Sequence, residues 1–292
     1  MKIKVAASEK LFNIANYIFL ALCAFVTIFP FLNILAVSFS SSRAIISGEV
    51  FLLPVEGTIT AYKNLIQDGQ LIQAFVNSVV ITVTGTIINI VATIMVAYPL
   101  SRKTLPGKSF FLGMIVFTML FGGGMIPSFI LIKMLGLINT YGSLWFPSMV
   151  SVFNMIVLLN FFRGIPAELE EAADIDGAND IYKLVRIVLP LSLPVIASLT
   201  LFYAVHWWNS YFSPMMYITT SSKQPMTVKL MQMISNFNDS LMKSGDTTVT
   251  EQLVPEGVKA AAIIITITPI LSVYPFLQKY FVKGVMIGAI KG

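Results

Sequence analysis

The residues that could carry chemistry are concentrated in one polar stretch, residues 168–190, which reads ELEEAADIDGANDIYKLVRIVLP. Between residues 163 and 186, six acidic side chains accompany three basic ones, and long apolar runs lie on either side. The whole chain has one histidine, His206, and one cysteine, Cys23, and it lacks a metal-ligand cluster or paired carboxylates in an aqueous setting. The stretch therefore predicts a polar surface for a macromolecular partner, and we assign no catalytic or metal-binding residue.

Two short helices joined at a glycine are expected to present this stretch. Pro166 suits the first helical position, where a missing N–H costs nothing, and the glutamates that follow lie near the positive end of the helix dipole. Gly177 can adopt the left-handed conformation that ends the turn, and Asn179 or Asp180 can cap the second helix. The second helix is expected to stop at Pro190. Its apolar face comprises Ile181, Leu184, Val185 and Val188.

The small residues Ala172, Ala173 and Gly177 leave one side of the first helix nearly bare, so another backbone can approach it. Glu171-Ala172-Ala173, then Gly177 after three residues and Ile187-Val188-Leu189-Pro190 after nine more, resembles the EAA loop of ABC importer permeases. In that family this loop is a coupling helix in a cleft of a separate ATPase subunit. The resemblance implies that residues 163–190 form the coupling loop, with ATPase-docking roles for Glu171, Ala172, Ala173, Gly177, Ile187, Leu189 and Pro190. An ordinary cytoplasmic amphipathic hairpin is the alternative.

Two other segments extend the resemblance to carbohydrate uptake. Residues 122–127, GGGMIP, with Leu135-Gly136-Leu137, resemble the subgroup that imports complex oligosaccharides, and residues 284–292 are similar to the tail of the smaller maltose-type permease subunit. The resemblance implies four kinds of partner: a second permease subunit, two ATPase subunits that bind ATP and Mg, an external solute-binding protein and a saccharide. It implies no cofactor in this chain, and it implies that the external loop 213–258 reaches the binding protein.

Composition predicts a membrane protein. The 292 residues are 56% hydrophobic and 11% charged, whereas a soluble domain has roughly a quarter charged residues. Because a span needs roughly 20 apolar residues, each long gap between charges holds one span. The gaps are residues 11–42, 69–101, 109–132, 134–162, 187–222 and 260–278. We predict an all-α integral membrane protein with six transmembrane helices. It comprises residues 1–73, an N-terminal span with an external segment, and a permease core, 74–292.

The distribution of basic residues predicts the orientation. With the N-terminus inside, inner segments hold twelve Lys and Arg residues and outer segments hold seven over a longer length. This bias places both termini in the cytoplasm. We expect the chain to be a multi-pass protein of a bacterial-type cytoplasmic (inner) membrane. The net charge of +5 is scattered along loops and does not indicate nucleic-acid binding. The N-terminal lysines and apolar run are interpreted as an uncleaved first span rather than a signal peptide.

Several spans have irregular features. Pro30 is expected to kink the first span, residues 17–37, or to mark its outer end. The third span, residues 110–132, should be broken near Pro127, while residues 144–162 and 191–212 form the fourth and fifth. Residues 60–72 could form an amphipathic helix on the outer membrane face or pack in a core.

The second span, residues 74–100, carries a polar stripe at helical spacing. The stripe comprises Ser78, Thr82, Thr86, Asn89 and Thr93, with Gly85 beside it. Small and hydroxyl residues on one face favour close helix packing, and a water-filled pathway wall is the alternative. The loop that follows contains Gly107-Lys108-Ser109, but the earlier glycine and the strand of a phosphate-binding loop are missing.

Aromatic residues at the end of the fifth span suggest where a saccharide could touch the chain. Trp208 and Tyr211 are three residues apart and are expected to share a helix face, with Asn209 beside them. Flat rings complement the apolar faces of sugars, so these three residues are candidates for the substrate pathway. A membrane-interface belt is the alternative.

We predict a permease subunit of an ATP-driven, binding-protein-dependent sugar or oligosaccharide importer that alternates its access between the two sides. The first alternative is a permease of the same architecture for a peptide or an amino acid. A sodium-coupled secondary carrier is the second. A proton-coupled carrier is disfavoured because the centres of the spans hold no ionisable side chain.

Overall fold

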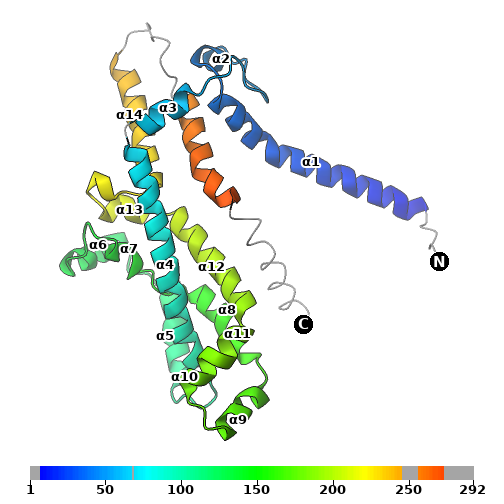
Figure 1. Ribbon diagram of the computed structural model, residues 1–292, viewed down its shortest axis with the longest axis vertical. Coiled ribbons are helices and arrows are strands. Elements are labelled where there is room, and N and C mark those ends of the chain that lie inside the picture. Colours follow the sequence, from blue (N-terminus) through cyan, green and yellow to red (C-terminus); the bar gives the residue numbers. More distant parts are fainter. Residues whose placement is uncertain (1–6, 68, 245–255, 273–292) are drawn as a thin grey trace. The chain divides into compact units, whose positions relative to one another are not determined.

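The computed structural model describes residues 7–67, 69–244 and 256–272, and the regular elements in these ranges are helices (Figure 1). The first half contains α1 Ala7–Ser38, α2 Ser42–Ile46, α3 Thr60–Gln67, α4 Gln70–Ser101, α5 Lys108–Leu120, α6 Met125–Met134, α7 Gly142–Trp145 and α8 Val152–Arg163. Then follow α9 Ala167–Ile175, α10 Asp180–Lys183, a π-helix at Leu184–Val188, α11 Leu189–Leu191, α12 Leu193–Trp208, α13 Phe212–Tyr217, a 3₁₀ turn at Ser221–Lys223, and α14 Met226–Ser244. Residues 256–272 are also helical.

The chain divides into two compact units, Met1–Gly69 with Leu230–Thr268 and Gln70–Lys229 with Pro269–Gly292. In the first unit, the Tyr62 hydroxyl donates to Ser38 Oγ at 2.8 Å, which joins α3 to the end of α1. Ala61 and Leu65 on α3 are buried, so this helix packs in a core. The helix ends at Gln67, earlier than predicted, and Gly69 has a left-handed backbone before α4 begins. The predicted domain division between residues 73 and 74 stays a prediction.

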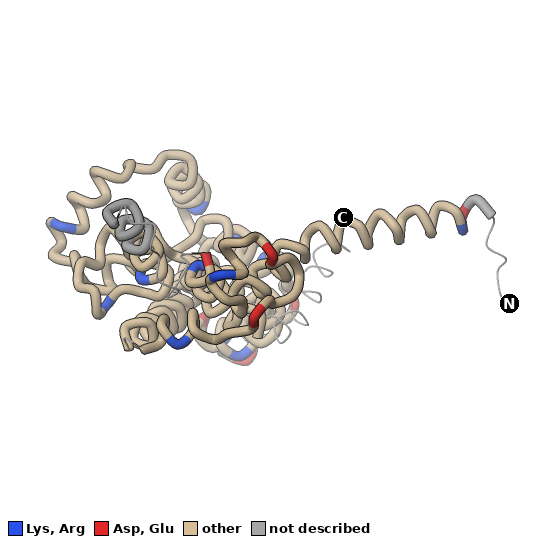
Figure 2. The backbone as a smooth tube through the Cα atoms, turned by 90° about the horizontal axis from the view of Figure 1, so that it is seen from above, with Lys and Arg blue, Asp and Glu red and all other residues tan. Residues whose placement is uncertain are grey.

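The core of the second unit lies around α4, which packs against both α12 and α8 (Figure 1). Apolar side chains from these helices are fully buried there: Ala97, Met155, Leu158, Phe162 and Leu199, together with Val188. Burying each of the larger side chains, those other than Ala97, contributes about 1.5–3 kcal/mol. These helices therefore form a scaffold that holds the loops at its ends. Lys, Arg, Asp and Glu residues are sparse along the described chain (Figure 2), as expected for helices in a membrane.

The polar stripe on α4 faces other helices of the same chain. The Asn89 amide donates to the Met149 carbonyl at 2.8 Å and accepts from the Trp207 indole at 2.5 Å. One α-turn further along α4, Thr93 Oγ1 lies 2.8 Å from the Tyr203 hydroxyl. Both stripe residues are almost completely buried. This part of the stripe therefore serves helix packing, the interpretation that the sequence favoured.

Gly85 allows the close approach of α12 to α4. A Cβ atom placed there would lie 2.6 Å from Trp207 Nε1. Because this indole is buried and hydrogen-bonded to Asn89, it cannot move aside freely. Gly85→Ala is expected to lower the free energy of unfolding by about 1–3 kcal/mol through overpacking. Thermal unfolding in detergent measures this effect.

The matched control is Gly113→Ala, since Gly113 also lies within a helix, α5, and has open space around its Cβ position. This substitution is expected to leave stability unchanged or to raise it slightly, because alanine favours the helix. Equal unfolding temperatures for the two variants would contradict the packing role of Gly85.

By length and composition, two helices in the described ranges can cross a membrane, Glu9–Ser38 and Gln70–Ser101. Three bent helix pairs raise this number to five if each pair forms one span. The predicted break in the third span is confirmed, because α5 and α6 meet at 114°. The predicted sixth span, 260–278, is described only to residue 272. The total of six spans stays a prediction.

One predicted boundary is wrong. The fourth span was expected to be continuous from residue 144, but α7 ends at Trp145 and α8 begins only at Val152. Pro147 lies in the interruption, where the missing N–H prevents continuous helical hydrogen bonding. In the first span, α1 continues through Pro30 to Ser38, so of the two alternatives for this proline the helix end is excluded and the kink stays a prediction.

Candidate docking site and outer pathway residues

The local signals of the coupling loop fold as predicted at its central turn. Gly177 has a left-handed φ of +76°, as predicted, whereas Pro166 is the N-cap of α9 and not its first helical residue. The Ala178 N–H donates to the Ala173 carbonyl at 2.9 Å, which satisfies a carbonyl at the end of α9. Asn179 caps the next helix by accepting from the Tyr182 N–H at 2.8 Å. The sequence therefore specifies this helix–turn–helix through its backbone chemistry.

The predicted end of the second helix at Pro190 is wrong. After α10, the chain forms the π-helix Leu184–Val188 and then α11, which contains Pro190 and ends at Leu191. A proline near the start of a helical segment needs no N–H, so the short segment after the π-turn accommodates it. This winding also places Val188 in the core of the second unit.

The predicted docking residues differ in exposure. Ala173 is only 8% exposed and packs against its own chain, so its small size serves internal packing and not the approach of a partner backbone. The exposed members are Glu171, Ala172, Gly177 and Pro190, and the half-buried members are Ile187 and Leu189. The surface available to a partner is therefore formed by the outer side of α9, by the turn after it and by the exposed start of α10.

Three exposed apolar side chains on this surface were not singled out as docking residues from the sequence. Ile175 is 88% exposed and Ile181 is 74% exposed, and Tyr182 lies beside Ile181 with more than half of its surface exposed. Apolar residues placed between acidic ones at the tip of a polar loop were the available signal. Such side chains on a surface, rimmed by polar groups, are typical of a protein-binding site.

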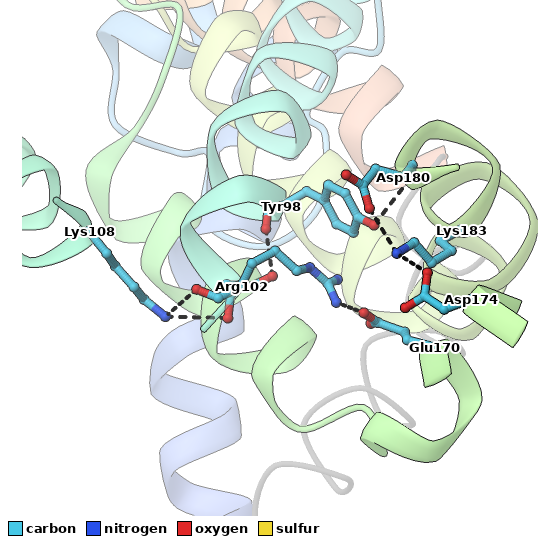
Figure 3. Close-up of polar contacts among 8 residues, drawn as sticks. Tyr98, Arg102, Lys108, Glu170, Asp174, Asp180 and Lys183 are labelled. Atoms are coloured by element: carbon cyan, nitrogen blue, oxygen red, sulfur yellow. Dashed lines mark hydrogen bonds and ion pairs between the residues drawn. The ribbon is translucent and has the colours of Figure 1, made fainter. Parts of the chain in front are cut away.

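Ion pairs join the two helices of the coupling loop (Figure 3). Lys183 Nζ lies 2.7 Å from an oxygen of Asp174 and 2.8 Å from one of Asp180. The hydrogen bonds that Lys183 donates to these carboxylates raise its own pKa, and the one that Asp180 accepts lowers the pKa of Asp180.

These pKa shifts determine the pH range over which the pairs contribute to stability. The contribution of Lys183 is lost only as the pH rises through its folded pKa, which lies above the usual value of about 10.4. The contribution of Asp180 is lost only as the pH falls through its folded pKa, which lies below the usual value of about 3.9. The pairs are therefore intact at neutral pH.

A second contact joins α9 to the end of α4 (Figure 3). The Arg102 guanidinium pairs with Glu170 and lies 4.1 Å from the centroid of the Tyr98 ring. The Tyr98 hydroxyl also donates to the Asp180 carbonyl at 3.2 Å. Lys108 Nζ donates to the Arg102 carbonyl at 3.1 Å, so this lysine caps the end of α4, consistent with a basic loop and not a nucleotide site.

The predicted arrangement of the pathway residues is wrong in one respect. Helix α12 ends at Trp208, Asn209 is its C-cap, and Tyr211 precedes α13. Trp208 and Tyr211 therefore do not share the face of one helix. The Trp208 side chain is buried, with 9% of its surface exposed, and its ring packs edge-on against Phe75 with 5.8 Å between the ring centroids. Asn209, in contrast, is exposed.

Part of the predicted external loop, 213–258, folds back onto α4. The Asn77 amide donates to the carbonyls of Ser222 and Gln224 at 2.8 and 3.0 Å. Ser78 Oγ accepts from the Met226 N–H at 2.8 Å. Beyond this contact the segment continues as helix α14. Residues 245–255 and the C-terminal segment 284–292 lie outside the described residues.

The described elements define a class of protein. Apolar helices surround a buried core, a polar helix–turn–helix projects from one end, and no described group of His, Cys, Asp and Glu could hold a metal. The apolar helices are those of an integral membrane protein, and the polar helix–turn–helix is its candidate docking surface. The chain belongs to the family of binding-protein-dependent transport system inner membrane components, whose family model matches residues 91–287.

Known proteins resemble almost the full length of the chain. Protein LplC of Bacillus subtilis strain 168 is 41% identical, with 97% of this chain and 96% of that protein covered. The polygalacturonan/rhamnogalacturonan transport system permease protein YtcP of the same strain is 38% identical, with 97% and 99% covered. A crystal structure of a bacterial ABC transporter involved in import of the acidic polysaccharide alginate matches with a TM-score of 0.85 and 34% identity, covering 94% of this chain and 98% of that chain.

Family membership determines the type of subunit. The chain is a non-catalytic permease subunit of an ABC importer, and a separate ATPase carries out ATP hydrolysis. A partner permease and a solute-binding protein are implied as well. The hypothesis of a sodium-coupled carrier is therefore abandoned, and the chain is a multi-pass protein of the cytoplasmic membrane.

Proposed function

We propose that this chain is one of two permease subunits through which an ATP-driven, binding-protein-dependent importer moves sugars or oligosaccharides. The relative YtcP is named for polygalacturonan and rhamnogalacturonan transport, and the structural relative takes part in alginate import. These cargoes favour a saccharide over the peptide or amino acid alternative. Because both include uronate polymers, we further propose that the cargo is an oligosaccharide that carries carboxylates.

The observation that carries the coupling part of this proposal is the exposed surface of α9 and its turn. Ile175 and Ile181 are exposed apolar side chains on a loop that is otherwise acidic. A cleft in an ATPase subunit would bury these side chains and pair with the surrounding carboxylates. Two ATPase subunits would dock in this way, one on each permease, and their closure would move the coupling loops.

We also propose the orientation that this mechanism needs. Both termini and the coupling loop lie in the cytoplasm, in agreement with the excess of basic residues in the inner segments. The segment 213–258 is then external and meets the binding protein. Trp208, Asn209 and Tyr211 lie on the outer side of the cargo pathway, although they do not form one helical face.

The docking surface is tested by Ile175→Asp in the full importer complex. A buried charge without a partner is unfavourable, so this variant is expected to lower ATPase co-purification by about tenfold, equivalent to roughly 1.4 kcal/mol. Ile46→Asp is the matched control, because Ile46 is 68% exposed on α2 in the segment proposed to be external. Equal recovery of the ATPase with both variants would contradict the docking proposal.

The cargo is tested with the co-purified solute-binding protein and a glycan panel. Oligogalacturonates are expected to bind this protein and to stimulate ATP hydrolysis by the complex more than neutral maltooligosaccharides do. Stimulation by neutral sugars alone would overturn the acidic cargo.

The pathway residues are tested by measuring saccharide uptake in cells. Trp208→Ala and Asn209→Ala should weaken uptake while the amount of the permease in the membrane stays unchanged. Parental uptake by both variants would show that these residues form only an aromatic belt at the membrane interface.

A further inference from the structure

Helix α9 is weakly anchored by apolar packing. It meets α8 at an angle of 68° and ends at the glycine turn of Gly177. Ala173 is the one residue that α9 buries in the described chain. A nine-residue helix with so little buried apolar surface is held to its scaffold mainly by its polar side chains. The ion pairs that α9 makes therefore determine how its movement reaches the membrane helices.

One of these ion pairs leads directly to the central helix of the scaffold. Glu170 on α9 pairs with Arg102, the residue that follows the last residue of α4. Only 17% of the Glu170 side chain and 23% of the Arg102 side chain are exposed. Partial burial reduces screening by solvent, so this pair is stronger than an ion pair on the open surface.

The Arg102 side chain is itself held in place. Its guanidinium lies over the Tyr98 ring, one turn earlier on α4, and the Tyr98 hydroxyl binds the backbone of Asp180 at the start of α10. An arginine can stack on a ring and bind a carboxylate at the same time because its charged group is planar. Arg102 thus connects α9 to α4, which in turn packs against α12 and α8 (Figure 3).

We propose that Arg102 is a positioning residue for transport, because its contacts with Glu170 and Tyr98 make α4 follow the movements of the docking helix α9. The inference rests on the proposed docking of α9 to the ATPase. Without Arg102, α9 would lose its side-chain contact with the end of α4 and could move while α4 stays in place. The ATPase would then still bind, but its movement would not reach the other end of α4.

A purely structural role for Arg102 would affect folding or assembly, so the test needs a readout of the movement itself. Ile72 lies near the other end of α4 and is 56% exposed. In the full importer complex, with Cys23→Ser to remove the native thiol of this chain, Ile72→Cys provides the single labelling site of this chain, whose labelling is followed on the separated subunit. The labelling rate with a maleimide is measured without nucleotide and after trapping with ATP and vanadate.

In the complex with Arg102 intact, trapping is expected to change the labelling rate by about fivefold or more, a typical size for coupling between sites. Arg102→Gln should remove this change while ATPase co-purification stays at the parental level. The charge exchange, Arg102→Glu with Glu170→Arg, should restore part of it, which loss of fold integrity would not. Lys103→Gln is the matched control, because Lys103 is the exposed basic neighbour of Arg102.

Each other result counts against the inference. A normal response in Arg102→Gln would show that α4 follows α9 without this contact, and loss of the ATPase from this variant would make Arg102 an assembly residue. Failure of the charge exchange to restore any response would remove the role of the Glu170 pair. An absent response in the parent complex would contradict movement of α4 itself. Failure of the docking proposal is recognised separately, by unchanged ATPase recovery with Ile175→Asp.

Discussion

Asn89→Leu is expected to lower the free energy of unfolding by about 3–5 kcal/mol, because it leaves several buried polar groups without partners. The Asn89 amide donates to the carbonyls of Ser148 and Met149 at 2.5 and 2.8 Å, and its oxygen accepts from the Trp207 indole. Leucine has a similar volume but can make none of these hydrogen bonds. The substitution thus breaks the polar contacts that join α4 to the segment before α8 and to α12.

Thermal unfolding in detergent measures this loss, and Asn209→Leu is the control because Asn209 is exposed. Trp207→Phe keeps a buried ring but removes the indole donor, so it should cost less than Asn89→Leu. The double variant should be less destabilised than the sum of the two single variants, because both disrupt the same hydrogen bond. Additive effects would show that Asn89 and Trp207 act independently.

Gly177→Val is expected to have the largest effect on transport that does not involve misfolding of the core. Gly177 has a φ of +76°, and a Cβ in that region costs about 1–2 kcal/mol, more for a branched side chain. The turn that closes α9 would then open in part of the population, and the surface carrying Ile175 would lose its shape. ATPase co-purification and uptake should both fall by about five- to thirtyfold.

The control at the same position is Gly177→Asn, because asparagine tolerates the left-handed conformation better than other residues with a side chain. Open space surrounds the Cβ position, so a difference between the two variants reflects the backbone and not a clash. Ala173→Arg should act in the same direction as valine, since Ala173 is buried against its own chain. Equal loss with asparagine and valine would show that the side chain itself obstructs the partner.

The sequence by itself was sufficient for the features that depend on neighbouring residues. Gly177 and Asn179 end one helix and cap the next through backbone conformation and a local hydrogen bond, so their roles follow from residue type and spacing. The break in the third span was expected from Pro127, also a local feature, and it lies just before that residue, between α5 and α6. The motif around Glu171 identified a permease because its fixed residues lie within twenty positions.

Only the tertiary structure decided which side chains meet across long separations. Arg102 and Glu170 are 68 positions apart, and Asn89 and Trp207 are 118 apart, so no local rule pairs them. The structure also places Ala173 inside and Ile175 outside, although both lie on the same short helix. Such choices depend on how α4, α8 and α12 pack, because packing, and not residue type, determines which polar groups lose water and must find partners.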